Sequence, residues 1–122
     1  MKVTHLQSST QLIQMGDLVV LTDPWLTDGE YYGSWYCYPP FDKHKLSSLE
    51  YDFIYVSHIH PDHISEKTFR LLPKKKPVLI RKYESNFLKN KVESLGFDVI
   101  ECMSGERFKL DCDSSITIFS AD

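Results

Sequence analysis

Three of the five histidines in this 122-residue chain, together with one aspartate, fall within residues 58–63. In an extended segment, side chains two residues apart point to the same side, so His58 and His60 are expected to face one way together. Pro61 keeps the residue before it extended and therefore preserves this pairing. The aspartate and the third histidine follow where the chain turns toward a helix, so they are rotated away from the first pair. One short loop can thus offer two ligands to one metal ion and two to another nearby.

The candidate metal ligands are His58, His60, Asp62 and His63, whose imidazole and carboxylate donors suit Zn(II), Mn(II) or Fe(II). Asp62 is also the candidate catalytic residue, because a carboxylate here could orient a water molecule or accept its proton. It could alternatively cap the following helix. A single histidine would more often be structural, but three with an aspartate, directly after a buried strand, favour a metal-binding loop.

The loop follows four adjacent apolar or aromatic residues within Asp52–Ser57, which indicates a strand buried on both faces. Open α/β sheets bind their ligands at the carboxyl ends of such strands. Before it we expect antiparallel strands at 2–7, 9–15 and 18–23 and a helical turn near 46–50. After it we expect helices at 65–72 and 85–95 and strands at 77–80, 97–102, 106–110 and 115–120. This pattern predicts an α/β (α+β) domain with a mixed sheet and helices on one face.

Residues 24–45 form a long loop crowded with aromatic side chains. Trp35 could wall a substrate pocket, because sugars and acyl groups stack well on aromatic rings. The loop could equally pack over the sheet, and both roles stay open. His5, on the first strand, could face the pocket, although a lone strand histidine is more often a partly exposed structural residue. Cys37 has no neighbouring base or cation, so we assign it no nucleophilic role.

The composition is that of one globular domain, with 42% hydrophobic and 25% charged residues. A net charge of −3 gives no electrostatic reason to expect a nucleic-acid partner. The three cysteines form no C-x-x-C pair, which favours a reducing, cytoplasmic setting over a disulfide framework. The first residues lack the apolar run of a signal peptide, and the apolar stretches are too short to span a bilayer, so no membrane partner is expected.

The segment Ser57-His58-Ile59-His60-Pro61-Asp62-His63 resembles the H-x-H-x-D-H motif of the metallo-β-lactamase superfamily. Upstream, Thr22-Asp23-Pro24-Trp25-Leu26 resembles the aspartate-containing strand end of the same superfamily. Thr4-His5-Leu6-Gln7, Asp23-Pro24-Trp25, Trp35 and Pro39-Pro40 are similar in order and spacing to the branch with CMP-N-acetylneuraminate hydroxylase-like proteins. The resemblance covers residues 2–72 well. It implies the N-terminal half of an αββα sandwich, with residues 1–122 as a single domain truncated at its C-terminus.

The resemblance also implies a role for each residue of the motif. His58 and His60 would hold a first metal ion, and Asp62 and His63 a second, with zinc expected and manganese or iron as alternatives. Asp23 would lie beneath and orient the histidine loop, unless it is a strand-end turn residue. No histidine follows His63, so the first metal has two protein ligands where catalytic zinc normally has three. This chain alone is therefore expected not to hold a tight dinuclear site, and its metal positions could stay unoccupied.

The function that follows is a metal-dependent hydrolase that uses a metal-activated water on a small-molecule ester, lactone, amide or phosphoester. Two alternatives stay open: an accessory or binding protein of nucleotide-sugar or surface-polysaccharide metabolism, and an inactive fragment of a longer enzyme. No cysteine begins a C-x-H or C-x-x-H pattern, so Rieske-type monooxygenase chemistry is not supported. Because the chain stops directly after a strand, an exposed core edge could produce a homo-oligomer.

Overall fold

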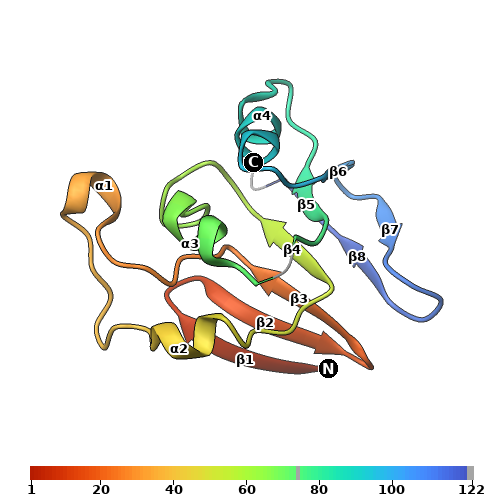
Figure 1. Cartoon of the computed structure of the whole chain (residues 1–122). Helices are drawn as coiled ribbons and strands as arrows, with labels where there is room; N and C mark the ends of the chain where they lie inside the picture. Colours follow the sequence, from red (N-terminus) through yellow and green to blue (C-terminus); the bar gives the residue numbers. More distant parts are fainter. Residues whose placement is uncertain (74, 121–122) are drawn as a thin grey trace.

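The chain is built on a six-stranded mixed sheet with a two-stranded hairpin beside it (Figure 1). The computed structural model describes residues 1–73 and 75–120. The strands are β1 (Lys2–Gln7), β2 (Thr10–Met15), β3 (Leu18–Thr22), β4 (Phe53–Val56), β5 (Val78–Arg81), β6 (Val99–Cys102), β7 (Arg107–Lys109) and β8 (Ser115–Thr117). The helices are α1 (Glu30–Gly33), α2 (Lys43–Leu46), α3 (Glu66–Leu71) and α4 (Phe87–Ser94). The expected domain span of 1–122 includes residues 74, 121 and 122, which lie outside the described residues.

The strand order in the large sheet is β1-β2-β3-β4-β5-β6. The first three strands are antiparallel neighbours, and β3 to β6 pair in parallel, as the predicted mixed sheet requires. The last pair between β3 and β4 is Thr22 with Tyr55, and the amide of Asp23 continues it by donating to the carbonyl of Tyr55 at 2.8 Å. The carboxyl ends of β3 and β4 therefore meet, which places Asp23 beside the start of the histidine loop.

Helices α2, α3 and α4 pack on one face of the sheet and the β7–β8 hairpin lies against the other (Figure 1). Ile54 and Val56 of β4 point into the larger core, where Phe69 of α3 and Val92 of α4 are also buried. The alternate residues of β4 face the smaller cluster with Ile118, which follows β8. The alternation of a pleated strand thus divides β4 between two layers. The predicted one-sided helical cover is confirmed, whereas β4 is fully buried only on the helix side and half-buried, through Phe53 and Tyr55, on the hairpin side.

Capping side chains explain where two of the helices begin. The hydroxyl of Ser65 accepts from the amide of Thr68 at 3.2 Å and caps α3. A carboxylate of Asp42 accepts from the amide of His44 at 3.0 Å, so α2 begins at Lys43 and not near residue 46 as the sequence pattern predicted. The expected loop at 24–45 also contains the irregular turn α1, which was not predicted.

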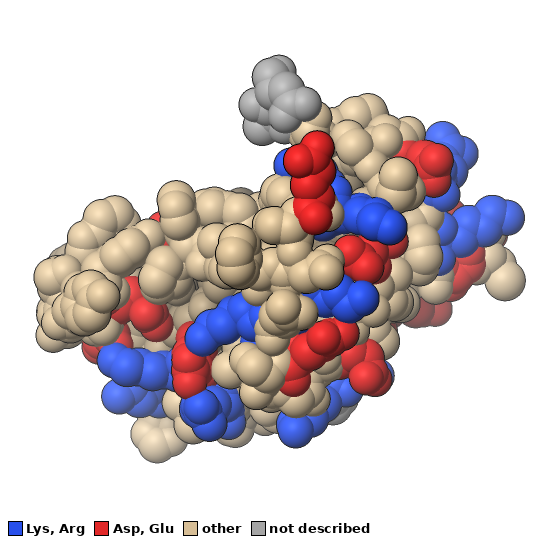
Figure 2. All heavy atoms as spheres, turned by 90° about the horizontal axis from the view of Figure 1, so that it is seen from above, with Lys and Arg blue, Asp and Glu red and all other residues tan. Residues whose placement is uncertain are grey.

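Glu66 forms one ion pair within α3 and a second that connects α3 to α4. Glu66 of α3 accepts from Arg70 at 2.6 Å and from Lys91 of α4 at 2.7 Å. Figure 2 shows acidic and basic side chains interspersed on the face seen from above, without a broad field of one sign on that face. No helix in the described part of the chain has the length and apolar character needed to cross a lipid bilayer.

Candidate metal centre

The four predicted ligands lie together in the loop that follows β4. The ring centres of His58 and His63 are 4.1 Å apart, and those of His58 and His60 are 4.6 Å apart. The atoms that face each other are Nε2 of His58 and Nδ1 of His60, at 3.0 Å. In the second pair, Oδ2 of Asp62 faces Nε2 of His63 at 3.5 Å. The facing donor atoms therefore fall into the two pairs that the spacing of the motif predicts, although the shortest ring separation joins His58 and His63 across these pairs.

The distance between the two donor atoms of each pair fits two ligands of one metal ion. Two nitrogens on one tetrahedral metal, each bonded at about 2.0–2.1 Å, stand roughly 3.3 Å apart. The distance between the facing nitrogens of His58 and His60 is within a few tenths of an ångström of that value. Within residues 1–73 and 75–120, however, no group of three or more His, Cys, Asp or Glu side chains could hold a metal ion. Each pair would therefore need further donors to complete a site.

Asp23 supports the loop from beneath. Its Oδ1 accepts from the amide of Ser57 at 2.7 Å and its Oδ2 from the hydroxyl of Ser57 at 2.9 Å. The same Oδ2 lies 3.1 Å from Nδ1 of His63. Asp23 has a positive φ of 40°, a conformation that aspartate tolerates better than most residues, and its carbonyl accepts from the hydroxyl of Thr10 at 2.8 Å. The backbone is thus held where the carboxylate reaches the loop.

This arrangement assigns the tautomers of two histidines. The single hydroxyl proton of Ser57 is donated to Asp23, so the Ser57 oxygen can accept from Nδ1–H of His58 at 2.9 Å. Nδ1 of His63 lies 3.3 Å from the same Ser57 oxygen, to which it can donate in the same way, and Oδ2 of Asp23 lies 3.1 Å from that nitrogen. Both rings then present a bare Nε2 to the cluster, the form in which imidazole binds a metal. Since Nε2 of His63 and Oδ2 of Asp62 are then both acceptors, a proton or a metal cation between them relieves their repulsion.

Tyr31 fixes the other carboxylate of the cluster, and the sequence did not predict this contact. Its hydroxyl donates to Oδ1 of Asp62 at 2.7 Å, and its ring lies 4.6 Å from that of Trp35. The hydrogen bond raises the pKa of Tyr31. Burial acts to raise the pKa of Asp62, but the Tyr31 hydrogen bond, followed by the hydrogen bond from the backbone of Asp62 itself, lowers it overall. Burial is the main cause of the lowered pKa of His58, followed by His63, which favours the neutral, metal-binding form.

The two candidate pocket residues lie together but away from the four ligands. His5 and Trp35 line a cavity of about 570 Å³ to which none of the predicted ligands contributes. Nε2 of His5 is bonded to the carbonyl of Ser8 at 2.9 Å on an exposed surface. Trp35 connects to the cluster indirectly, through its ring contact with Tyr31. The aromatic loop thus reaches the histidine cluster with Tyr31 and not with Trp35, the candidate pocket residue.

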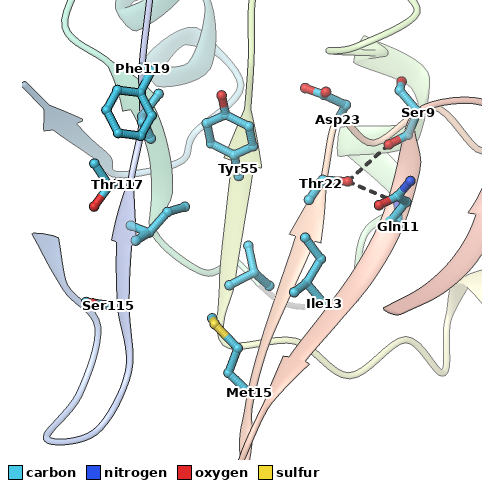
Figure 3. A pocket seen from close by; sticks show the side chains of 13 residues that line it. Ser9, Gln11, Ile13, Met15, Thr22, Asp23, Tyr55, Ser115, Thr117 and Phe119 are labelled. Carbon is cyan, nitrogen blue, oxygen red and sulfur yellow. Dashed lines mark hydrogen bonds between the residues drawn. The ribbon is translucent and has the colours of Figure 1, made fainter. Parts of the chain in front are cut away.

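A second cavity, of about 280 Å³, lies directly beside the cluster. His58, Ser57 and Tyr55 line it together with Arg81 at the end of β5 and Tyr83 just beyond. Tyr55 also lines a larger apolar groove of about 480 Å³ that runs along β2, β3 and β8. Figure 3 shows the hydroxyl of Tyr55 and the carboxylate of Asp23 at the same end of this groove. Arg81 and Tyr83 were missed by the sequence analysis, although the carboxyl end of a parallel neighbour of β4 is where such residues belong.

With this geometry in place, the comparisons with known proteins define the class. Residues 2–110 match the model of the β-lactamase superfamily domain, and the chain belongs to that superfamily. The sequence-based assignment of family and fold is therefore confirmed.

Two relatives show which known proteins the chain resembles in sequence. The chain is 34% identical to a cytidine monophosphate-N-acetylneuraminic acid hydroxylase of Asterias rubens over 79 residues, 62% of this chain and 12% of the relative. It is 33% identical over 99 residues, 80% of this chain and 19% of the relative, to a Mycobacterium tuberculosis protein described provisionally as a Rieske 2Fe-2S iron-sulfur protein. The chain thus spans less than a fifth of the length of either relative.

Two solved structures share the fold. One is an isothiocyanate hydrolase from Delia radicum gut bacteria, with 21% identity and a TM-score of 0.64 over 88% of this chain and 43% of that one. The other is a possible metal-dependent hydrolase from Veillonella parvula, with 22% identity and a TM-score of 0.64 over 89% of this chain and 44% of that one. At these identities the likeness establishes the fold.

Proposed function

We propose that the chain carries the ligand-bearing half of a metal-dependent hydrolase acting on small molecules. The observation that carries this proposal is the pairing of donor atoms after β4: Nε2 of His58 faces Nδ1 of His60, and Oδ2 of Asp62 faces Nε2 of His63. The two solved neighbours, both described as hydrolases, add support at the level of the class. Superfamily membership adds support for the fold on which such a site is built.

In this proposal His58 and His60 hold one metal ion, and Asp62 and His63 hold a second. Zinc is the first candidate, because it accepts nitrogen and carboxylate donors in tetrahedral sites, and manganese or iron are the alternatives. Bound ions would supply Lewis acidity and bring the pKa of a water molecule toward neutrality. Donors from a second chain, or from sequence beyond these residues, would complete the ligand sets.

The chain's own residues have distinct tasks in the reaction. Asp23 and Ser57 hold His58 and His63 with Nε2 free. Tyr31 occupies Oδ1 of Asp62, which leaves Oδ2 to orient a water molecule or accept its proton. Such chemistry suits esters, lactones, amides and phosphoesters, all of which are hydrolysed by attack of water on an electrophilic centre.

Metal titration followed by turnover tests this proposal. We expect excess Zn(II) to raise the Tm of the chain, because a ligand that binds the folded state stabilises it. Retention of the metal after desalting is expected only once further donors complete the two ligand sets. His60→Ala should abolish the shift. His44→Ala is the matched control, since His44 is an exposed histidine outside the cluster. Metal-loaded protein should then hydrolyse at least one member of an ester, lactone and phosphodiester panel. Substoichiometric metal with no thermal shift would favour an inactive fragment.

A binding role in nucleotide-sugar metabolism is the second candidate. It is favoured by the 34% identity to a cytidine monophosphate-N-acetylneuraminic acid hydroxylase over 79 residues. Calorimetry with CMP-linked sugars separates the two functions. Saturable binding without hydrolysis in metal-loaded protein would favour the accessory role, whereas release of the sugar or the nucleotide would favour the hydrolase.

A further inference from the structure

We propose that the cavity beside His58 is an anion-binding subsite in which Arg81 receives a carboxylate or phosphate group of the substrate. As a subsite for the reacting molecule it rests on the proposed hydrolase function. Its capacity to bind an anion does not rest on that function, because it depends on groups that are independent of any metal.

The position of Arg81 follows from strand pairing. The parallel register sets Val56 of β4 against Ile80 of β5, so the next residues, Ser57 and Arg81, lie side by side at the carboxyl ends of the two strands. Both line the cavity of about 280 Å³, together with His58. A group bound to Arg81 would therefore lie next to the first residue of the predicted metal pair.

Arg81 is held in place by an aromatic ring that is itself fastened to the histidine loop. Its guanidinium lies 4.2 Å from the ring centre of Tyr83, a contact that orients the planar group. The hydroxyl of Tyr83 donates to the carbonyl of Ser57 at 2.5 Å. Any movement of the loop would therefore be coupled to Arg81. Such preorganisation lowers the entropy cost of binding a ligand.

The guanidinium of Arg81 has N–H donors available to bind a ligand. Among residues 1–73 and 75–120 no carboxylate forms an ion pair with Arg81. An arginine carries five N–H donors in a planar fork that matches carboxylate and phosphate oxygens. Tyr55 adds a further donor on the same cavity, because its hydroxyl forms no hydrogen bond with the residues that the structure describes. The nearby carboxylates of Asp23 and Asp62 are already engaged, by Ser57 and by Tyr31.

The walls of the cavity indicate the rest of the ligand. Ile118 and Phe119 line both this cavity and the apolar groove of about 480 Å³. Figure 3 shows Phe119 and Tyr55 side by side at the end of that groove nearest Asp23. A substrate with an anionic group at Arg81 could extend an apolar portion along the groove while its reactive bond faces His58. The substrate class is thus a small amphiphilic anion that carries a hydrolysable bond.

Titration of the metal-free chain tests the subsite without involving the hydrolase. NMR spectra are recorded in EDTA at constant ionic strength while inorganic phosphate, and in a second arm acetate, is added. We expect saturable shifts at Nε–H of Arg81 and at the amides of Ser57 and Tyr83. The arm that saturates at lower concentration identifies the preferred anion. Absence of saturable shifts in both arms would overturn the proposal.

Three variants define the contribution of the side chain. Arg81→Gln should weaken the binding by about 10-fold or more, because a charge-assisted forked contact is lost. Arg81→Lys keeps the charge and the aliphatic stem but not the fork, and should weaken it by several-fold. Lys82→Gln is the matched control, since it removes a positive charge from the adjacent, exposed position, and should leave the binding unchanged. If Lys82→Gln and Arg81→Gln weaken anion binding equally, the binding depends on general surface charge and the proposal is wrong.

The anion subsite and the proposed hydrolase can fail separately, because different measurements test them. Phosphate or acetate binding that needs Arg81, in protein that also contains the completing metal donors and still shows no metal-dependent turnover, would support the subsite and contradict the hydrolase. Metal-dependent turnover in which Arg81→Gln leaves the KM ratio of matched anionic and neutral esters unchanged would support the hydrolase and contradict the subsite.

Discussion

Replacing Ser57 by alanine removes one oxygen that has three partners. The hydroxyl donates to Asp23 at 2.9 Å and lies 2.9 Å from Nδ1 of His58 and 3.3 Å from Nδ1 of His63. The backbone amide of Ser57 still donates to Asp23, so the loop stays anchored. The carboxylate of Asp23 loses one charge-assisted hydrogen bond, and His58 loses the acceptor that fixes its proton on Nδ1. The proton of His58 is then free to move to Nε2, the atom that faces His60.

The size of the effect can be set from these contacts. Hydrogen bonds to charged groups contribute about 1.5–3 kcal/mol, and Ser57 is partly exposed, so we expect a loss of about 1–2 kcal/mol in the free energy of unfolding. Loss of a group that orients a metal ligand typically costs 10–100-fold in metal affinity. That range corresponds to about 1.4–2.8 kcal/mol. The two effects are similar in size and therefore need separate measurements.

Three readouts separate these effects. Urea unfolding gives the stability of the metal-free chain, competition with a chromogenic chelator gives the zinc affinity, and imidazole ¹⁵N shifts report the tautomer of His58. Ser47→Ala is the matched control, because it deletes the same atom from an exposed hydroxyl that donates to the carbonyl of His44. We expect Ser57→Ala to bind zinc about 10–100-fold more weakly than the wild type. If its zinc affinity is within about twofold of the wild type and His58 keeps its Nδ1–H form, the proposed role of Ser57 in orienting His58 is refuted.

Three further changes have outcomes that follow from the structure. Tyr31→Phe should weaken metal binding by several-fold in a chelator competition while leaving the Tm within a few degrees, because it frees Oδ1 of Asp62; unchanged affinity would contradict a positioning role. Phe69→Ala should lower the free energy of unfolding by about 3–5 kcal/mol in urea, because Phe69 is 2% exposed in the main core; a loss below about 1 kcal/mol would contradict that packing. The pKa of Glu66 is lowered to about 2 by hydrogen bonds from Lys91 and Arg70, so its ionised form stabilises the fold above the usual pKa and loses that contribution as the pH falls toward about 2. The stability difference between wild type and Glu66→Gln should therefore be small, under about 1 kcal/mol for exposed pairs, and should shrink between pH 4.5 and 2; a difference that grows on acidification would contradict the sign.

The features that the sequence predicted well are those set by short-range geometry. The pairing of His58 with His60 needs only the two-residue period of an extended chain and Pro61 after it. The strand before the loop needs only an unbroken apolar run, because strands buried on both faces carry no alternation. Position 42 shows the limit of such patterns even at short range. Asp42 is a favourable cap, yet the prediction followed the apolar residues further on and placed the helical turn too late.

The features that the sequence did not predict depend on contacts between distant segments. Tyr31 reaches Asp62 from 31 positions away, through a turn in which Tyr31 and Tyr32 both adopt positive φ. Residues with such backbone angles are uncommon and follow no spacing rule. Arg81 and Tyr83 meet the histidine loop because β5 pairs with β4 in a particular register. Parallel register is set by packing of the whole sheet, so a single strand's sequence does not reveal which of its end residues will face the site.

The two carboxylates of the cluster have the same chemistry, and the donors around them give them different tasks. Asp23 accepts from the amide and the hydroxyl of Ser57 and lies against Nδ1 of His63, so both of its oxygens are engaged. Its side chain is 10% exposed, and it has no free oxygen to offer a metal ion. Asp62 has one oxygen held by Tyr31 and the other turned toward a nitrogen that carries no proton in the assigned tautomer. An acceptor that faces another acceptor is stable where a cation lies between them. The difference in donor count therefore supports our proposal that Asp23 orients the loop and that Asp62 is a metal ligand.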